Sequence, residues 1–325
     1  MKTQNLSLLA ALSLFIAGCQ SDQTPPPAPA PATPTCNSRT ASKGGVKFAG
    51  IRSSYYGFGD ENRRPNFPTP DEAATVMKNI AKKFSATPSA VWIVGGIIGN
   101  DCRLEFEETP TNDPHIKFTG TDKHTPYLNK FDEIGAKVYL QIEAGRADMK
   151  ELIRLVLEKY GNHRSVAGFG IDVEWYPSDG ETNGPGEKVQ VKLDTTHLKE
   201  LECLVKSYNP QYKIFVKHYN AAYVGGKPVG DVVYINDSYG FPGLTDFATE
   251  FAKWANNFYP NEVGFQIGYS GDNKQDYNWW SELKKPMEEM VEAVENKMKY
   301  GDKQTVNVYW VDFTIRWKEF DYLWK

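Results

Sequence analysis

The sequence has few histidines and cysteines, no strong excess of one charge, and no long hydrophobic run beyond its first residues. Its 325 residues carry 37 Lys and Arg against 41 Asp and Glu, a formal net charge of −4. This near-balance excludes the basic surface that nucleic-acid binding requires. The 4 cysteines and 5 histidines include no pair at metal-ligand spacing, so we expect neither a metal nor another cofactor.

Aromatic residues, in contrast, are abundant. They make up 13% of the chain, as 8 Trp, 18 Tyr and 17 Phe. Such a content either fills a large core or lines a site for flat ligands that are apolar on one face, such as sugar rings.

The first 18 residues have the pattern of an export signal. Lys2 precedes an apolar run from Leu6 to Ile16, which has the length of a signal segment and is too short to span a bilayer. The run ends in Ile16-Ala-Gly-Cys19, which resembles the bacterial lipobox. The resemblance implies that Cys19 becomes the lipid-modified first residue, and that the protein is anchored to the outer membrane, because Gln20 rather than Asp follows. The alternative is an ordinary signal peptide in which Cys19 occurs by chance.

A Pro- and Ala-rich segment, residues 19–42, follows the signal. Proline at this density favours extended polyproline II, so we interpret the segment as a tether. Residues 43–325 then form one folded domain. Export permits a disulfide, and any one pair among Cys36, Cys102 and Cys203 is possible.

The domain alternates short β-rich runs with helical patterns, which predicts an α/β fold, a single (β/α)8 TIM-type barrel. The predicted strands are 46–53, 90–98, 137–143, 166–174, 213–217, 232–236, 263–267 and 306–313. The predicted helices are 70–84, 127–134, 147–160, 196–208, 246–259 and 280–300. About fourteen residues separate the fifth and sixth strands, so the helix between them should be missing or shortened. A doubly wound sheet would need a Gly-rich turn where the sequence has Ser53-Ser-Tyr-Tyr-Gly57.

Barrel sites lie at the carboxyl ends of the strands, and the fourth strand ends in Asp172-Val-Glu174. Residues at i and i+2 of a strand share a face, so both carboxylates should point to the barrel opening. Two close carboxylates raise the pKa of one of them, which can then protonate a glycosidic oxygen at neutral pH. We therefore predict Glu174 and Asp172 as a catalytic pair. A structural pair neutralised by Arg or Lys, or a metal ligand, is the alternative.

Polar and aromatic residues recur at the other predicted strand ends, where they suit the edge and the face of a pyranose. Each aromatic residue could equally pack in the core. The predicted substrate-binding residues are Glu143, Trp175, Tyr176, His218, Tyr219, Asn236, Asp237, Tyr239, Gln266, Tyr269, Trp310 and Asp312. Arg52, at the end of the first strand, is expected to pair with Glu143 or Asp172.

The segment from Gly168 to Pro177, GFGIDVEWYP, resembles the fourth-strand motif of glycoside hydrolase family 18, the chitinases and endo-β-N-acetylglucosaminidases. The resemblance implies that Glu174 is the general acid/base and that Asp172 orients the N-acetyl group of the substrate, which acts as internal nucleophile. Two earlier aspartates of the family correspond here to Gly170 and Ala167. The sixth-strand Tyr-Asp pair of the family corresponds to Asn236-Asp237.

The family 25 lysozymes are similar in ending their fourth strand in Asp-x-Glu on a barrel that lacks helices. They usually carry an Asp at the end of the first strand, where this sequence has Arg52-Ser-Ser-Tyr55. We expect a lipid-anchored glycoside hydrolase that acts on an N-acetylhexosamine glycan. The alternatives are a catalytically silent, glycan-binding barrel and a two-carboxylate hydrolase of another polysaccharide, including a muramidase-like one. The expected partners are a glycan and the membrane, with no nucleic acid, and the expected state is a monomer.

Overall fold

The computed structural model describes residues 36, 44–53, 67–176, 182–184, 187–188, 192–270, 278–316 and 318–325. The predicted signal segment, Cys19 and nearly all of the tether lie outside the described residues. Pro34–Lys325 form one compact unit. Within the described part of the chain, no helix is both long enough and apolar enough to cross a membrane.

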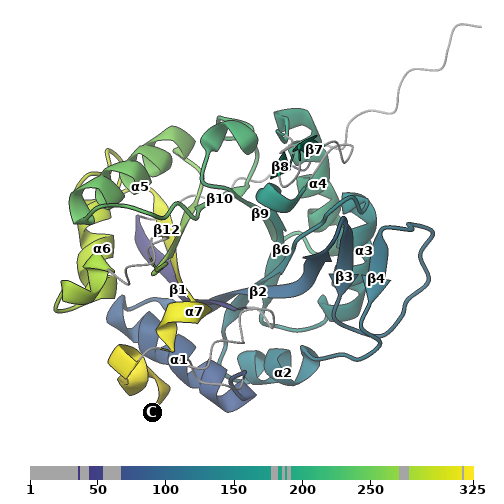
Figure 1. Ribbon diagram of the computed structural model, residues 1–325, viewed down its shortest axis with the longest axis horizontal. Coiled ribbons are helices and arrows are strands. Elements are labelled where there is room, and N and C mark those ends of the chain that lie inside the picture. The colour runs from purple at the N-terminus through teal and green to yellow at the C-terminus, as the bar shows by residue number, and fades with distance from the viewer. Residues whose placement is uncertain are drawn as a thin grey trace, which may run out of the picture. The chain divides into compact units, whose positions relative to one another are not determined.

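Eight parallel strands form a closed ring, which Figure 1 shows from one end. In order around the ring the strands are β1 (Gly45–Ser53), β2 (Thr87–Ile98), β5 (Lys137–Ile142), β6 (Val166–Asp172), β9 (Lys213–Lys217), β10 (Val233–Asn236), β11 (Val263–Ile267) and β12 (Thr305–Val311). The ring is closed because β1 pairs with both β2 and β12. The predicted (β/α)8 barrel is therefore confirmed. Its strands were readable because strands buried on both faces are almost continuously apolar.

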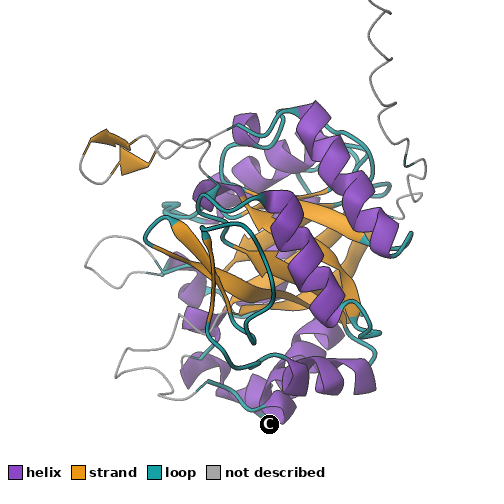
Figure 2. Ribbon diagram, turned by 90° about the vertical axis from the view of Figure 1, so that its right-hand side faces the viewer, coloured by secondary structure: helices purple, strands orange, loops and turns teal. Residues whose placement is uncertain are grey.

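Helices surround the ring (Figures 1 and 2). They are α1 (Pro70–Lys83), α2 (Thr125–Glu133), α3 (Met149–Tyr160), α4 (Thr195–Tyr208), α5 (Leu244–Phe258) and α6 (Pro286–Glu295). Side-chain caps set several of their starts, with Asp148 capping α3 and Asp194 capping α4. Between β9 and β10 the described chain forms only the short 3-10 helix η3 (Ala221–Tyr223), in agreement with the predicted shortened segment.

Several elements differ from the prediction. The fourth strand ends at Asp172, two residues early, and a 3-10 turn, η2 (Val173–Trp175), follows it. The predicted helix 280–300 is wrong in extent, because η4 (Trp279–Glu282) comes first and α6 begins only at Pro286, a residue suited to the first turn of a helix. After β2 the chain adds β3 (Asp101–Leu104) and β4 (Ile116–Phe118), which extend the sheet outside the ring (Figure 1).

The remaining elements are short. The two-stranded pair β7 (Thr182–Gly184) and β8 (Glu187–Lys188) lies in the segment predicted as a loop, residues 177–191. The chain ends with α7 (Asp312–Ile315), which follows β12 directly, and η5 (Lys318–Trp324), which packs against α1.

The inside of the barrel is filled rather than open. Large side chains from five strands form a buried cluster there, composed of Val91, Tyr139, Phe215, Val233, Ile235 and Tyr309. A second and larger cluster packs the helices against the outside of the ring. Because the interior is packed as a core, a ligand can enter only from the ends of the strands.

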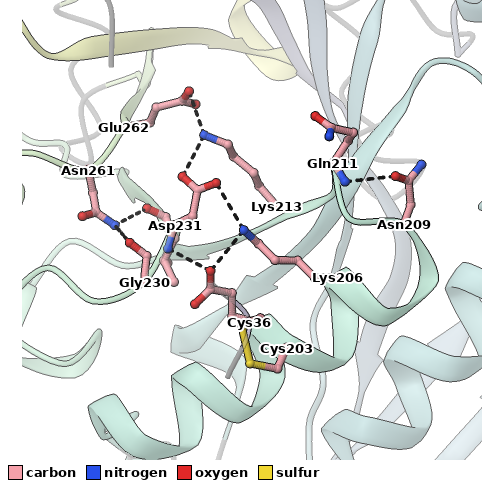
Figure 3. Close-up of polar contacts among 12 residues, drawn as sticks. Cys36, Cys203, Lys206, Asn209, Gln211, Lys213, Gly230, Asp231, Asn261 and Glu262 are labelled. Atoms are coloured by element: carbon pink, nitrogen blue, oxygen red, sulfur yellow. Dashed lines mark hydrogen bonds and ion pairs between the residues drawn. A yellow bond between two sulfur atoms is a disulfide. The ribbon is translucent and has the colours of Figure 1, made fainter. Parts of the chain in front are cut away.

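A buried ion network lies where three strands begin (Figure 3). Lys213 Nζ lies 2.9 Å from Glu262 Oε1 and 3.0 Å from Asp231 Oδ1, and Lys206 Nζ lies 3.3 Å from Asp231 Oδ2. Alternating charges offset much of the cost of removing each ion from water. Since Lys213, Asp231 and Glu262 stand at or just before the starts of β9, β10 and β11, the network belongs to the end of the barrel opposite its carboxyl ends.

A disulfide joins Cys36 to Cys203 of α4 (Figure 3). This pair resolves the alternatives that the sequence left open. Cys102 remains a free, buried thiol in β3, and burial raises its pKa well above the ordinary value. The bond joins Cys36, which precedes β1 in the sequence, to α4. The two cysteines are 167 residues apart in the sequence.

Candidate functional site

Three carboxylates meet at the carboxyl ends of the strands. Asp172 ends β6, Glu174 lies in η2, and Asp237 follows β10, and one oxygen of each lies within 4.8 Å of the others. The sequence placed Asp172 and Glu174 together, but its reason was wrong. The two do not share a strand face, because the strand has already ended and the 3-10 turn carries Glu174 into the cluster.

Lys217, the last residue of β9, is the positive charge of this cluster. Its Nζ lies 2.8 Å from Asp172 Oδ2 and 2.6 Å from Asp237 Oδ2. Gln141 Nε2 donates a further hydrogen bond to Asp172 Oδ2 at 3.3 Å. The three carboxylates could hold a cation, and Lys217 leaves Asp172 Oδ1 and Asp237 Oδ1 without a hydrogen-bond partner among the described residues. Sequence reasoning missed Lys217, because no local pattern marks a lysine at the end of β9 as the neighbour of these carboxylates.

Burial and neighbouring charges give the ionisable groups of the cluster different pKa values. Burial, with Asp237 and Asp172 adding to it, raises the pKa of Glu174 to about 8. Burial raises the pKa of Asp172 to about 6, and Lys217 opposes this rise. Burial alone would lower the pKa of Lys217, but Asp172 and Asp237 outweigh it and raise that pKa well above the usual value. At pH 7, Glu174 therefore holds a proton while Asp172 is largely ionised.

Arg52 of β1 supplies a second positive charge. Its NH1 lies 3.5 Å from Asp312 Oδ1 and its NH2 lies 4.0 Å from Glu143 Oε1. Of the two predicted partners, the one that the structure pairs with Arg52 is Glu143. The backbone N–H of Ile97 also donates to Glu143 Oε2 at 3.1 Å. The excess of carboxylates over cations at this end of the barrel contributes to the raised pKa of Glu174.

Several buried polar atoms at the same end have no hydrogen-bond partner among the described residues. Four of them are Asp172 Oδ1, Asp237 Oδ1, Asn236 Nδ2 and Gln266 Oε1. The second polar atom of each side-chain amide does have a partner. Asn236 Oδ1 accepts from the Ser238 N–H at 2.7 Å, and Gln266 Nε2 donates to the hydroxyl of Tyr269. A buried polar atom without a partner costs about 1–3 kcal/mol. These three acceptors and one donor are therefore suited to a polar ligand or to water.

The predicted aromatic residues divide into exposed and buried ones. Tyr219 and Tyr239 are 44% and 49% exposed, and the ring of Tyr239 lies 5.4 Å from that of Tyr269. Trp310 is only 1% exposed and packs in the core. Its Nε1 donates to Thr314 Oγ1 at 2.8 Å. The structure thus brings the tyrosines to the barrel opening and removes Trp310 from it.

His218 is fully buried beside the cluster. Its ring stacks on Tyr223 with the centroids 4.6 Å apart, and its Nδ1 accepts the Asn220 N–H at 2.8 Å. Burial lowers the pKa of His218 to about 4, and nearby Asp237 only partly opposes this. The imidazole is therefore neutral at pH 7 and adds no positive charge to the site.

Two hollows lie near the carboxyl ends of the strands. One lies between the ends of β10 and β11 and is lined by Tyr239, Tyr269 and Trp279 among others. The other, of about 580 Å³, is lined by Tyr176 and His197 among others. Trp175 stands between Glu174 and Tyr176 in the sequence, and its carbonyl accepts the Gly145 N–H at 2.7 Å.

The fold and the site together define a (β/α)8 barrel with a buried acidic centre in which one carboxyl is protonated at neutral pH. A scan against models of known protein families gave no match, and neither did a search of curated protein sequences.

Among solved structures, the chain is similar to a glycoside hydrolase family 5 enzyme from Prevotella bryantii, solved with a xyloglucan oligosaccharide. That similarity has 10% identity, 89% of this chain and 100% of that chain covered, and a TM-score of 0.43. The chain is also similar to a family 18 chitinase from Pseudoalteromonas aurantia, with 13% identity, 86% and 97% of the chains covered, and a TM-score of 0.42.

Proposed function

We propose that the protein is a glycoside hydrolase that cleaves an N-acetylhexosamine-containing glycan, with Glu174 as general acid/base. The observation that carries the proposal is the pKa of about 8 for Glu174, beside Asp172 at the carboxyl ends of barrel strands. A carboxyl that keeps its proton at pH 7 can donate it to a glycosidic oxygen, while an ionised partner stabilises the positive charge that develops on the sugar.

The chemistry follows from the two environments. Glu174 gives its proton to the leaving oxygen as the bond from this oxygen to the anomeric carbon breaks. In a substrate-assisted route, the acetamido oxygen of the sugar forms the new bond to that carbon. Asp172 Oδ1, which has no partner among the described residues, would accept the acetamido N–H. Glu174, now ionised, then takes a proton from the water that opens the intermediate.

Lys217 would keep Asp172 ionised during these steps, because its ammonium contacts Asp172 Oδ2 and leaves Oδ1 available. The unpartnered atoms of Asn236, Asp237 and Gln266 would bind hydroxyl groups. The sugar specificity rests on the resemblance of the fourth-strand motif to family 18, and the polar atoms of the site support a sugar without choosing among sugars.

We further propose that the enzyme acts outside the cytoplasm, as a lipoprotein anchored through Cys19 to the outer membrane. The disulfide between Cys36 and Cys203 supports an oxidising compartment, since such bonds are rare where thiols are kept reduced. The anchor would hold the barrel close to cell-surface or imported glycans.

The test is the release of reducing sugar from chitin, N-glycans, peptidoglycan and neutral polysaccharides. Glu174→Gln should reduce turnover by about 10²–10⁴-fold, the usual contribution of a general acid/base. Glu295→Gln is the matched control. Glu295 is also half-buried, and burial raises its pKa, but it lies at the end of α6 that leads back to the start of β12.

The pH profile should show an acid of matching pKa. We expect kcat/KM to fall as pH rises above about 8, because Glu174 loses its proton there. Glycan binding by the wild type without turnover on any substrate would favour the silent, glycan-binding barrel. Turnover that survives Glu174→Gln would show that another group is the acid.

A further inference from the structure

The hollow of about 580 Å³ lies at the same end of the barrel as the proposed catalytic residue. It forms where the segment after β5 meets the segment after β6, which are joined by the hydrogen bond from the Gly145 N–H to the Trp175 carbonyl, 2.7 Å long. Tyr176, which lines the hollow, is two residues beyond Glu174. The volume of the hollow is in the range of ordinary ligand sites.

Tyr176 and His197 form a flat aromatic strip in this hollow. Their ring planes are 4° from parallel and their centroids are 6.5 Å apart, while the Tyr176 hydroxyl lies 3.4 Å from His197 Nε2. An oxygen-to-nitrogen approach this close is incompatible with rings stacked face to face at that separation, so the rings lie side by side. Such a strip suits the C–H face of a pyranose.

The polar groups around the strip have distinct roles. Asp148 and Asp194 accept backbone N–H groups at the starts of α3 and α4, and Asp113 accepts the Asp148 N–H at 2.6 Å. These carboxylates are thus engaged in structure. Arg146 and Lys192 are exposed and line the hollow as cationic hydrogen-bond donors, which suits the hydroxyl groups at a sugar edge.

Another hollow, of about 790 Å³, adjoins the one that Tyr176 and His197 line. The two share Asp113 and Pro114 as lining residues, and the second continues over residues 108–120. The two hollows together have room for more than one sugar.

We propose that the strip of Tyr176 and His197 is a sugar-binding subsite for a polymeric glycan, which holds a residue of the chain away from the cleaved bond. The inference rests on the proposed function. A pyranose lies with its apolar face on the two rings and its hydroxyl groups toward Arg146 and Lys192. The enzyme then favours long chains over short ones.

The test compares kcat/KM for a chitin-type hexasaccharide with that for the disaccharide aryl glycoside. Tyr176→Ala and His197→Ala should each lower the ratio of long to short substrate about five- to tenfold, the loss of one ring contact. Tyr208→Ala should leave the ratio unchanged. Tyr208 is an exposed tyrosine at the other end of α4, the helix that carries His197.

A binding measurement separates failure of the subsite from failure of the proposed function. Calorimetry of the hexasaccharide with Glu174→Gln, alone and combined with His197→Ala, should show affinity lowered by the second change. If no glycan is hydrolysed but this difference is seen, the hydrolase proposal fails and the subsite stands. If glycans are hydrolysed, and Tyr176→Ala and His197→Ala leave the ratio unchanged while His197→Ala also leaves the affinity unchanged, the subsite is overturned. His197→Ala decides the question if Tyr176→Ala does not fold.

Discussion

Replacing Glu174 by glutamine should make the protein more stable at alkaline pH while it removes activity. The pKa of Glu174 is about 8 in the fold, against an ordinary value of 4.5. Between these two pH values the native state binds a proton that the unfolded chain has lost. The stability of the wild type therefore falls as pH rises through this interval, and the neutral glutamine removes this contribution.

The size of the effect follows from the same interval. The distance from 4.5 to about 8, at 1.36 kcal/mol per pH unit, sets an upper limit of about 5 kcal/mol. Glu174 is only half-buried, so water and nearby side chains lower the free-energy cost of ionising it. We expect a gain of about 2–3 kcal/mol at pH 9 relative to the wild type.

Urea unfolding at pH 5, 7 and 9 measures this difference. The gain from Glu174→Gln should be small at pH 5 and should grow toward pH 9. Glu319→Gln, which changes an exposed glutamate of η5, should show no such trend. A difference that stays constant from pH 5 to pH 9, or a variant less stable than the wild type at pH 9, would refute the assignment of a buried, protonated carboxyl.

Two further changes test the ion cluster and the disulfide. Lys217→Met should destabilise the protein by about 3–5 kcal/mol at pH 7, because it leaves Asp172 and Asp237 buried without their cation. The loss should be smaller at pH 5 and partly reversed by adding Asp237→Asn, and a loss below about 1 kcal/mol in urea unfolding at both pH values contradicts the pairing. Cys203→Ser, which opens the 167-residue separation to Cys36, should cost up to about 5 kcal/mol. An unchanged Tm, with or without reductant, would show that the bond does not form.

The acidic site was only partly readable from the sequence. Asp172, Glu174 and Asp237 were found because each follows a recognisable strand, and strand ends of one sense gather at one end of a barrel. The 3-10 turn after Asp172 was not visible, because three residues carry no periodic pattern. Lys217 was missed for another reason. Its role depends on β9 lying between β6 and β10, a neighbourhood that no local pattern encodes.

The hollow lined by Tyr176 and His197 was also only partly predictable from the sequence. Tyr176 was predicted from its position after the fourth strand. His197 was not, because it lies in the first turn of α4, and it meets Tyr176 only through the way that helix packs in the fold. Trp310 is the opposite case, a residue predicted at the site that the structure places elsewhere. It stands at a strand end in the sequence, but the fold buries it against the rings of Trp280 and Phe320.

The sequence by itself determined the eight strands of the ring in their chain order, the shortened segment after the fifth, and the carboxylates at the strand ends. These depend on local hydrophobic patterns and on the fixed direction of parallel strands. Only the tertiary structure decided which charges neighbour which, and hence which carboxyl keeps its proton. The pKa of Glu174 is set by burial and by Asp237, a residue 63 positions away. Electrostatic energies depend on distances through space, and distances of this kind exist only once the ring has closed.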